Sequence, residues 1–294
     1  MYRKPDWNEE GRDWPNRDFS RFVAAAGLRW HVQQAGDGPD VLLIHGTGAS
    51  THSYAPLMRH LTDRFRVTTV DLPGHGFTET PALRDLRLPQ MAAQLEALIK
   101  ALDLEPAALV GHSAGAAIAT SLVLFGEVQP AAVVALNGAF KPFDGPAAQL
   151  FPMAARMLVL NPIAIRVLST SARDPKRVRR MLEGTGSRVD PDMLALYTVL
   201  FGASGHAAAV LTMMAQWDLD PLVERLDAIE TPLTLIVGEN DLAVPTRVSK
   251  DVARRVPNGR YIALPNLGHL AHEEDPAQIA ALIQGAIEGV NHTT

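Results

Sequence analysis

Runs of consecutive apolar residues alternate along this chain with segments of helical periodicity. A strand that is covered on both faces of a sheet is apolar at nearly every position, so such runs predict buried strands. Segment 28–36 instead alternates apolar and polar positions, which predicts an antiparallel strand at the edge of the sheet. The other predicted strands lie at 40–46, 65–71, 107–113, 131–138, 232–241 and 259–266.

Helical periods occupy the spaces between these strands. In 89–102 apolar residues recur at helical spacing, and Pro89 suits the first turn of a helix. Strands that alternate with helices are typical of a mostly parallel sheet with helices on both faces, so the pattern predicts an α/β fold. Further helices are predicted at 54–61, 114–125, 246–255 and 276–288.

The alternation stops between about 141 and 217, where helical periods follow one another without a strand. We interpret this stretch as a helical cap inserted into an α/β core, over the carboxyl ends of the strands. The predicted organisation is an N-terminal extension at 1–20, a core formed by 21–140 and 218–294, and a cap at 141–217.

Composition narrows the possible functions. The chain of 294 residues has a net charge of −5, which gives no support for nucleic-acid binding. It has no cysteine, so a disulfide framework, a thiolate metal site and a cysteine nucleophile are excluded. No apolar stretch is long enough for a transmembrane helix, and the charged first twenty residues lack the apolar region of a signal peptide. We therefore expect a cytoplasmic protein, and no residue pattern predicts a metal or another cofactor.

A single hydroxyl stands among small residues in Gly-His-Ser-Ala-Gly, residues 111–115. This pentapeptide fits the G-x-S-x-G pattern, in which a serine occupies a strained turn between a strand and a helix. Small neighbours leave room for the closely packed backbone of such a turn. Ser113 is therefore a candidate nucleophile. The alternative is that Ser113 only caps the helix predicted at 114–125, which needs no chemistry.

A serine nucleophile needs a base that takes its proton and an acid that orients the base. Asp241 closes the segment 232–241, and His269 lies in the turn after the next strand, which is the chain order of a serine-first triad. Asp241 would fix the imidazole tautomer, and His269 would carry the proton. The rival base is His272, which we expect on the following helix, and the rival acid is Glu239.

Two backbone N–H groups are needed to stabilise the oxyanion of such a reaction. Ala114, which follows the serine, is predicted to supply one, and Thr47 in His-Gly-Thr-Gly (45–48) the other. A nucleotide site is the competing interpretation, because Gly-Thr-Gly follows a strand and Asp71 ends the next one. It is disfavoured because Thr51 stands in place of the third glycine and Asp71 opens a tight turn, Asp-Leu-Pro-Gly-His-Gly.

Four motifs, HGTG, DLPGHG, GHSAG and GENDLAVP…GHLAHEEDP, closely resemble in order and spacing those of the α/β-hydrolase superfamily. The resemblance covers nearly the whole chain. It implies an eight-stranded, mostly parallel sheet, a Ser113–Asp241–His269 triad and a cap inserted after the sixth strand, near Gly138. The serine stands where haloalkane dehalogenases and epoxide hydrolases have aspartate, which argues against those two chemistries.

Within the superfamily, the stretch WNEEGRDWPNR (7–17) followed by GLRWHVQQAG is similar to one group. This group is the magnesium-chelatase accessory proteins of bacteriochlorophyll biosynthesis, the BchO type. The resemblance implies a biosynthetic context rather than a defined reaction. Trp7 and Trp14 in the N-terminal extension would either clasp the core or contact a partner.

Methionine and aromatic residues gather in the predicted cap, which holds six of the nine methionines. They predict an adaptable apolar pocket for a small apolar or amphiphilic substrate, although any one of them would equally suit the core of a helical subdomain. The predicted pocket residues are His45, His112, Met153, Met157, Met213, Met214 and Trp217.

Basic residues are concentrated at 156–188, which carries eight Arg or Lys against two acidic residues. The segment includes a predicted helix that begins at Pro175, with Val178, Met181 and Leu182 on one face. A solvated helix face is the simplest explanation. The sharper ones are peripheral contact with an anionic membrane surface, a partner protein, or the propionates of a tetrapyrrole.

Two classes of function follow. The first is a serine hydrolase that acts on a carboxylic ester of a bulky apolar substrate, or on a carbon–carbon bond. The second is a non-catalytic accessory or carrier protein on a hydrolase scaffold, which binds a porphyrin intermediate or magnesium chelatase. The complete set of nucleophile, acid and base favours the first class, and the similarity to accessory proteins favours the second.

Overall fold

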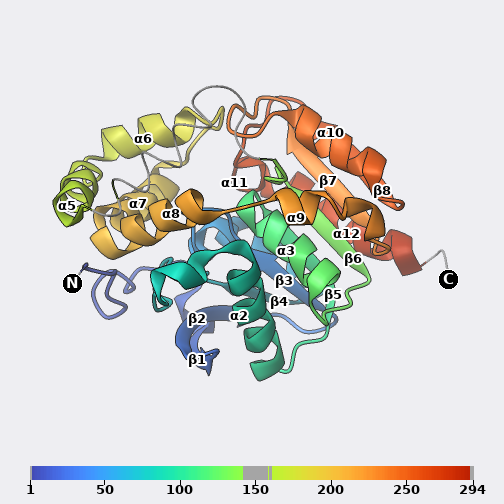
Figure 1. The fold of residues 1–294 in the computed structure, drawn as a ribbon, viewed down its shortest axis with the longest axis horizontal. Helices are drawn as coiled ribbons and strands as arrows, with labels where there is room; N and C mark the ends of the chain where they lie inside the picture. Colours follow the sequence, from blue (N-terminus) through green and yellow to red (C-terminus); the bar gives the residue numbers. More distant parts are fainter. Residues whose placement is uncertain (1, 142–157, 159–160, 292–294) are drawn as a thin grey trace.

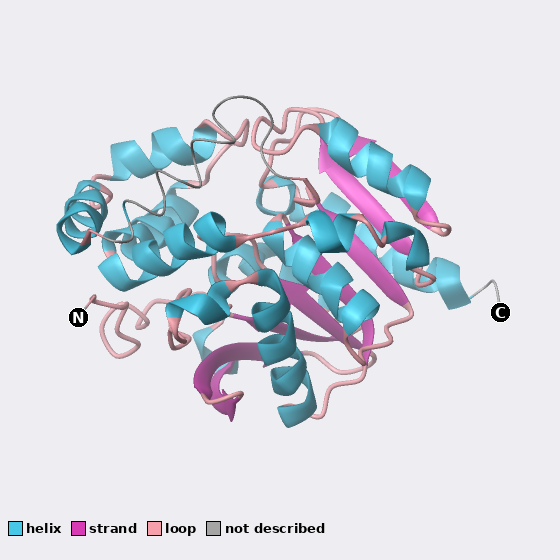
Figure 2. Ribbon diagram, in the orientation of Figure 1, coloured by secondary structure: helices cyan, strands magenta, loops and turns pink. Residues whose placement is uncertain are grey.

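The computed structural model describes residues 2–141, 158 and 161–291. These residues form one sheet of eight strands in the order β1-β2-β4-β3-β5-β6-β7-β8 (Figure 1, Figure 2). β2 pairs antiparallel with β1 and β4, and all other neighbours pair parallel, which confirms the predicted sheet. The strands are β1 (Ser20–Ala25), β2 (Leu28–Ala35), β3 (Asp40–Ile44), β4 (Arg66–Val70), β5 (Pro106–His112), β6 (Ala132–Leu136), β7 (Leu233–Gly238) and β8 (Gly259–Leu264).

The strand predicted at the edge of the sheet lies inside it, so that prediction is wrong. β1 forms the edge and pairs with β2 along its whole length. A two-residue turn joins them, in which Ala26 and Gly27 have φ of 51° and 73°. Positive φ at both positions is the geometry of a tight hairpin. Alanine rarely adopts positive φ, so Ala-Gly is a weak hairpin signal in the sequence.

Helices cover both faces of the sheet. Leu42 and Ile44 of β3 pack in one cluster with α2, α3 and α10, whereas Val41 and Leu43 pack on the other face with α1 and α12. Successive strand residues point to opposite faces, so a strand covered on both sides is apolar at most positions. The helices are α1 (Ala55–Leu61), α2 (Leu88–Ala101), α3 (Ala114–Phe125), α5 (Pro162–Ser171), α6 (Pro175–Glu183), α7 (Pro191–Gly202), α8 (Ser204–Gln216), α9 (Asp220–Val223), α10 (Thr246–Arg255), α11 (Ala271–Glu274) and α12 (Pro276–Asn291), with short 3-10 turns η1 (Arg17–Phe19), η2 (Thr51–Tyr54), η3 (Leu83–Leu86) and η4 (Leu226–Ala228).

Helices α5 to α8 lie over the loops at the carboxyl ends of the strands (Figure 1). Val178, Leu182 and Tyr197 from this layer pack against Ala49 and Leu270, which belong to the loops after β3 and β8. Within the described residues, no single helix is long and apolar enough to cross a membrane. Helices α7 and α8, bent by 85° at their junction, reach that length and composition only as a pair.

The N-terminal residues pack against the core. Trp14 is buried, and its indole N–H donates to Thr51 Oγ1 at 3.1 Å. Trp7 packs beside it in the same small cluster. The Gly205 N–H at the start of α8 donates to Arg3 O at 2.7 Å. These contacts make the N-terminal segment a clasp between the sheet edge and α8.

Candidate active site

Ser113 stands at a sharp turn between β5 and α3. Its backbone has φ of 50° and ψ of −115°, a conformation that strains a residue with a side chain. A Cβ on Gly111 would lie 2.3 Å from Gly115 O, and one on Gly115 would lie 2.0 Å from Ile44 O, so both positions require glycine. The Ser113 side chain makes no capping hydrogen bond to α3. Helix capping therefore does not account for this serine.

Asp241 and His269 meet in the loops that follow β7 and β8. Asp241 Oδ2 lies 2.8 Å from His269 Nδ1, and Oδ1 accepts from the N–H groups of Ala243 at 2.8 Å and Val244 at 2.9 Å. The two amides fix the plane of the carboxylate. Both acid and imidazole are largely buried. A hydrogen bond shielded from water in this way holds the imidazole in one orientation.

Asn137, directly after β6, is a site residue that sequence reasoning missed. Its buried side-chain Nδ2 donates to Asp241 Oδ2 at 2.7 Å, and this is the oxygen that faces His269. Its backbone φ is 48°, which asparagine tolerates better than most residues. The one sequence signal is Asn-Gly after a strand, which is equally typical of an ordinary turn.

The loop that carries His269 is held from three sides. The backbone N–H groups before and after this histidine donate to Glu274 Oε1 and Ser187 Oγ, each at 2.8 Å. Its carbonyl oxygen lies 2.9 Å from the ring Nε2 of His112. Ser187 belongs to the segment after α6, so the helical layer above the sheet takes part in placing this imidazole.

The rival acid and base lie elsewhere. His272 is fully buried on α11 with Nε2 2.8 Å from Ser53 Oγ, and burial lowers its pKa to about 3. Glu239 is exposed. Beside His272, the Glu273 carboxyl accepts from the hydroxyls of Ser53 and Tyr197, and burial raises its pKa to about 7. This second cluster joins α11 to α7 and is separate from Asp241.

Asp71 is occupied within the fold. Its Oδ1 accepts from the Thr51 N–H at 2.7 Å, and its Oδ2 accepts from the Phe77 N–H at 2.8 Å and lies 2.9 Å from His31 Nδ1. Burial opposes ionisation, but the charge and hydrogen bond of His31 outweigh it and hold the pKa of Asp71 well below its usual value. A carboxylate with both oxygens engaged is a poor ribose acceptor, which argues against a nucleotide site. No group of three His, Asp or Glu residues among those described is placed to hold a metal ion.

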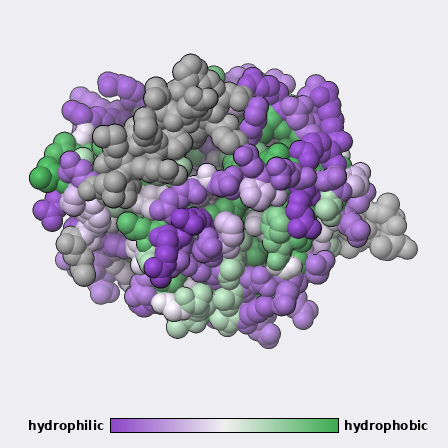
Figure 3. Space-filling view, in the orientation of Figure 1, coloured by the Kyte–Doolittle hydropathy of each residue, from purple (hydrophilic) through white to green (hydrophobic). Residues whose placement is uncertain are grey.

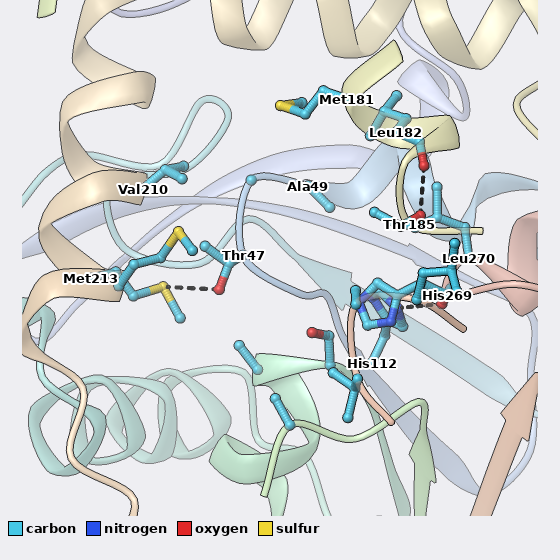
Figure 4. Close-up of a pocket in the computed structure, with 18 of the residues that line it drawn as sticks. Thr47, Ala49, His112, Met181, Leu182, Thr185, Val210, Met213, His269 and Leu270 are labelled. Atoms are coloured by element: carbon cyan, nitrogen blue, oxygen red, sulfur yellow. Dashed lines mark hydrogen bonds between the residues drawn. The ribbon is translucent and has the colours of Figure 1, made fainter. Parts of the chain in front are cut away.

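A cavity of about 560 Å³ brings the candidate residues together (Figure 4). Thr47, Ser113, Ala114 and His269 line it from the loops of the core. In Figure 4, Met181 and Leu182 come from one side of the helical layer and Val210 and Met213 from another. The apolar wall consists mainly of Met181, Leu182, Val210, Met213, Met214, Trp217, Leu219 and Leu242.

The loop after β3 lies against the serine turn. A Cβ on Gly46 would be only 3.0 Å from Ser113 Cβ. The Thr47 N–H makes no hydrogen bond to a described residue, and the Ala114 N–H lies in the first turn of α3, where amides have no acceptor within the helix. The Thr47 hydroxyl instead contacts Met213 Sδ at 3.8 Å (Figure 4). Thr47 and Ala114 line the same cavity as Ser113.

The predicted pocket residues separate into three groups. His45 does not line the cavity, which corrects the prediction: it is fully buried, its Nε2 accepts from the Leu72 N–H at 2.9 Å, and its Nδ1 lies 2.8 Å from Gly46 O. Its ring therefore supports the loop that follows β3. Met153 and Met157 lie outside the described residues. The predicted residues that do line the cavity are His112, Met213, Met214 and Trp217.

Comparison with protein families matches residues 39–276 to the alpha/beta hydrolase fold. The chain belongs to the α/β-hydrolase fold family. This α/β-hydrolase is 38% identical over 279 residues to the magnesium-chelatase 30 kDa subunit of Rhodobacter capsulatus, a match that covers 94% of this chain and 97% of that protein. The family and the similarity to magnesium-chelatase proteins, both predicted from the sequence, are confirmed.

Solved structures share the fold of this α/β-hydrolase. An alpha/beta hydrolase fold protein from Burkholderia ambifaria is 21% identical with a TM-score of 0.76, and the match covers 96% of this chain and 99% of that one. The enol-lactonase from Burkholderia xenovorans LB400 is 20% identical with a TM-score of 0.73, over 91% of this chain and 100% of that one. At these identities the likeness concerns the fold alone.

Proposed function

We propose that this α/β-hydrolase is a serine hydrolase that cleaves carboxylic esters of bulky apolar or amphiphilic substrates. The observation that carries the proposal is the 2.8 Å hydrogen bond between Asp241 and His269, at a cavity that Ser113 also lines. Ester cleavage by a serine needs an acid, a base and a hydroxyl at one cavity, whereas a binding protein needs none of them.

In the proposed reaction, Ser113 Oγ attacks the ester carbonyl carbon while His269 Nε2 takes the hydroxyl proton. Asp241 stabilises the imidazolium, and the N–H groups of Thr47 and Ala114 bind the oxyanion. The C–O bond then breaks, and His269 returns the proton to the departing alcohol, which leaves an acyl group on Ser113. A water molecule, deprotonated by His269, attacks this acyl group, and the carboxylic acid departs as the serine hydroxyl is restored.

The shape and lining of the cavity support the substrate class. A volume of about 560 Å³ is in the range of sites that enclose a drug-sized molecule. Met181, Met213 and Met214 line it with unbranched side chains that adapt to irregular apolar groups. We therefore propose that the bulky part of the ester lies under the helical layer, with its carbonyl at Ser113.

We also propose a three-part organisation for this chain, with an extension at 1–20, a core at 21–140 and 218–294, and a cap at 141–217. The described residues of the cap segment support it, because they form helices and no strand. They also supply the cavity wall that faces the core loops.

A second candidate function is a non-catalytic accessory or carrier role. The relative from Rhodobacter capsulatus, a magnesium-chelatase 30 kDa subunit by name, supports it. In this role the apolar cavity would hold a porphyrin intermediate, or the surface of the protein would bind magnesium chelatase, without turnover.

Labelling with a fluorophosphonate probe tests the first proposal. We expect the native protein to be labelled and Ser113→Ala to remain unlabelled. Ser121→Ala is the matched control, because it removes one hydroxyl from α3 away from the cavity. It should be labelled like the native protein. Labelling of Ser113→Ala at the native rate would refute the assignment of the nucleophile.

Titration with protoporphyrin and capture by chelatase subunits test the accessory role. A protein that resists the probe and hydrolyses no model ester, yet binds either partner, would favour the accessory function. If Ser113→Ala binds porphyrin like the native protein while only the native protein hydrolyses esters, binding and turnover are separate properties of one cavity.

A further inference from the structure

The outward face of α5 is apolar. Ile163 and Val167, one turn apart, are 73% and 64% exposed, whereas Ile165 and Ser169 on the opposite face are buried. Figure 3 shows hydrophobic residues gathered where α5 lies, at the left edge of the molecule. A helix that faces water normally presents polar residues outward. This face is therefore suited to an apolar environment.

The outward face of α6 is cationic. Val178 and Leu182 are buried, so Lys176 and Arg180 on the opposite side of the helix point outward, and both are exposed. The acidic residues of this region are already engaged, Asp174 with Arg177 and Glu183 with Arg179. Among the cations of α5, α6 and the turn between them, those that make no ion pair with a described residue are Arg166, Arg173, Lys176 and Arg180.

The two faces belong to one end of the molecule. α5 ends at Ser171 and α6 begins at Pro175, and Arg177 Nη1 donates to Ser171 Oγ at 2.6 Å across the junction. Arg166 lies on α5 itself, beside the apolar face. In Figure 1 the two helices form adjacent parts of the same outer layer. The exposed Arg166 therefore shares the outward face of α5 with Ile163 and Val167, and the cations of α6 follow directly along the chain.

We propose that α5 and α6 form a docking surface for an anionic lipid bilayer. Ile163 and Val167 enter the boundary between headgroups and acyl chains, and the unpaired cations contact lipid phosphates. Exposed aliphatic residues and unpaired cations together match an anionic bilayer. A polynucleotide matches the cations but not the exposed aliphatic residues, and a solvated face accounts for the cations alone.

Docking brings the rim of the cavity to the bilayer. Met181 on the flank of α6 and Leu242 in the loop after β7 are 47% and 74% exposed, and both line the cavity. The Leu242 N–H donates to Thr185 O at 3.0 Å, so this rim is fastened to the segment that follows α6. An amphiphilic ester then passes from the bilayer to Ser113 along an apolar rim. This last step rests on the proposed hydrolase function, whereas docking itself does not.

Co-sedimentation with vesicles tests the surface. We compare phosphatidylcholine vesicles with vesicles of equal parts phosphatidylcholine and phosphatidylglycerol, and expect the native protein to bind the anionic ones preferentially. Replacing Arg173, Lys176 and Arg180 with Gln should weaken that binding about a hundredfold at low salt, since each cation near an anionic surface contributes about fivefold. High salt should remove most of this difference.

Replacing Ile163 and Val167 with Ser tests the apolar half of the surface. The loss should be at least about tenfold, because two aliphatic side chains no longer leave water on docking. Salt does not screen burial of apolar surface, so this loss should persist at high salt. A salt-sensitive loss in the charge variant and a salt-independent loss in the aliphatic variant together indicate a surface that inserts apolar side chains and attracts anionic lipid.

Matched controls separate the surface from general effects. Lys250→Gln, Arg254→Gln and Arg260→Gln together remove three exposed charges from α10 and β8, and Leu83→Ser with Phe125→Ser removes two exposed apolar side chains elsewhere. Both variants should bind vesicles like the native protein. Thermal unfolding checks that every variant is folded.

Two results overturn the proposal. One is a native protein that does not sediment with anionic vesicles at low salt, even if a partner protein binds through the same residues. The other is a control triple variant that loses as much affinity as the variant with Arg173, Lys176 and Arg180 replaced. Ser113→Ala should bind vesicles like the native protein, so failure of docking and failure of the hydrolase proposal are separate results.

Discussion

Replacing Asn137 with Gly tests how the acid of the proposed triad is held. The substitution removes the Nδ2 donor that lies 2.7 Å from Asp241 Oδ2. Glycine accepts the positive φ of 48° at this position without strain, so the change is confined to the side chain. We expect Asp241 to hold the His269 imidazole less firmly, because one oxygen loses a charge-assisted hydrogen bond.

The size of the effect follows from the kind of bond. A hydrogen bond to a charged group contributes about 1.5–3 kcal/mol. If that contribution acts mainly in the transition state, where His269 carries a proton, kcat/KM should fall about 10- to 100-fold. KM should change little, because Asn137 does not line the cavity. The Ala243 and Val244 amides remain on the other oxygen, so the loss should stay below that of Asp241→Ala.

Steady-state hydrolysis of a p-nitrophenyl ester as a function of pH is the assay. Asn137→Asp extends the test, because it places a second carboxylate against Asp241. Like charges raise the pKa of one member of such a pair, and below that pKa the shared proton restores a donor. The activity of Asn137→Asp relative to Asn137→Gly should therefore rise as the pH falls.

Asn16→Gly is the matched control, since Asn16 also has a positive φ, of 57°, but lies in the N-terminal segment. It should leave kcat/KM unchanged. If Asn137→Gly retains kcat/KM within twofold of the native value while both variants are folded, the loop amides alone orient Asp241 and the reasoning fails.

Three further predictions concern the same region. Ser113→Ala and His269→Ala should each lower ester turnover by several orders of magnitude, as loss of a triad member does in other enzymes, and turnover within threefold of native would contradict the triad. Burial raises the pKa of Glu273 to about 7 in the folded state, whereas its ordinary pKa, expected in the unfolded state, is 4.5. Between these pH values the folded protein holds a proton that the unfolded protein has released. The stabilisation from this group is therefore fully present below pH 4.5 and is lost as the pH rises through 7. Glu273→Gln should cancel a pH-dependent loss of about 3 kcal/mol, and chemical denaturation curves of native and variant that shift in parallel with pH would show the reasoning to be wrong. Gly186→Ala should lower stability and turnover more than Gly27→Ala, as measured by thermal unfolding and ester hydrolysis. Both glycines have positive φ, but only at Gly186 would a Cβ meet a backbone carbonyl oxygen, at 1.8 Å. Equal losses in the two variants would mean that the backbone strain of positive φ, and not this steric clash, sets the effect.

Local patterns in the sequence were sufficient for most of the fold. Six of the eight strands were predicted from apolar runs and a seventh, β2, from its alternation, because a strand covered on both faces is apolar at nearly every position. The order of motifs placed Ser113, Asp241 and His269 after three different strands, and parallel strands end at the same edge of their sheet, so their meeting there was expected. The edge strand β1 was missed because its hairpin depends on a left-handed Ala26, which composition does not reveal.

The tertiary structure decided what each side chain touches. Asn137 and Asp241 are 104 positions apart, and His45 supports a loop instead of lining the cavity, because packing and not local sequence sets these contacts. In the basic region, too, the sequence shows one part and the tertiary structure the other. Its charge is evident from the sequence, but which cations are unpaired and which aliphatic residues stand beside them depends on how α5 and α6 pack. Sequence periodicity determines the faces of a helix, and only the neighbours of that helix determine which face is left outside.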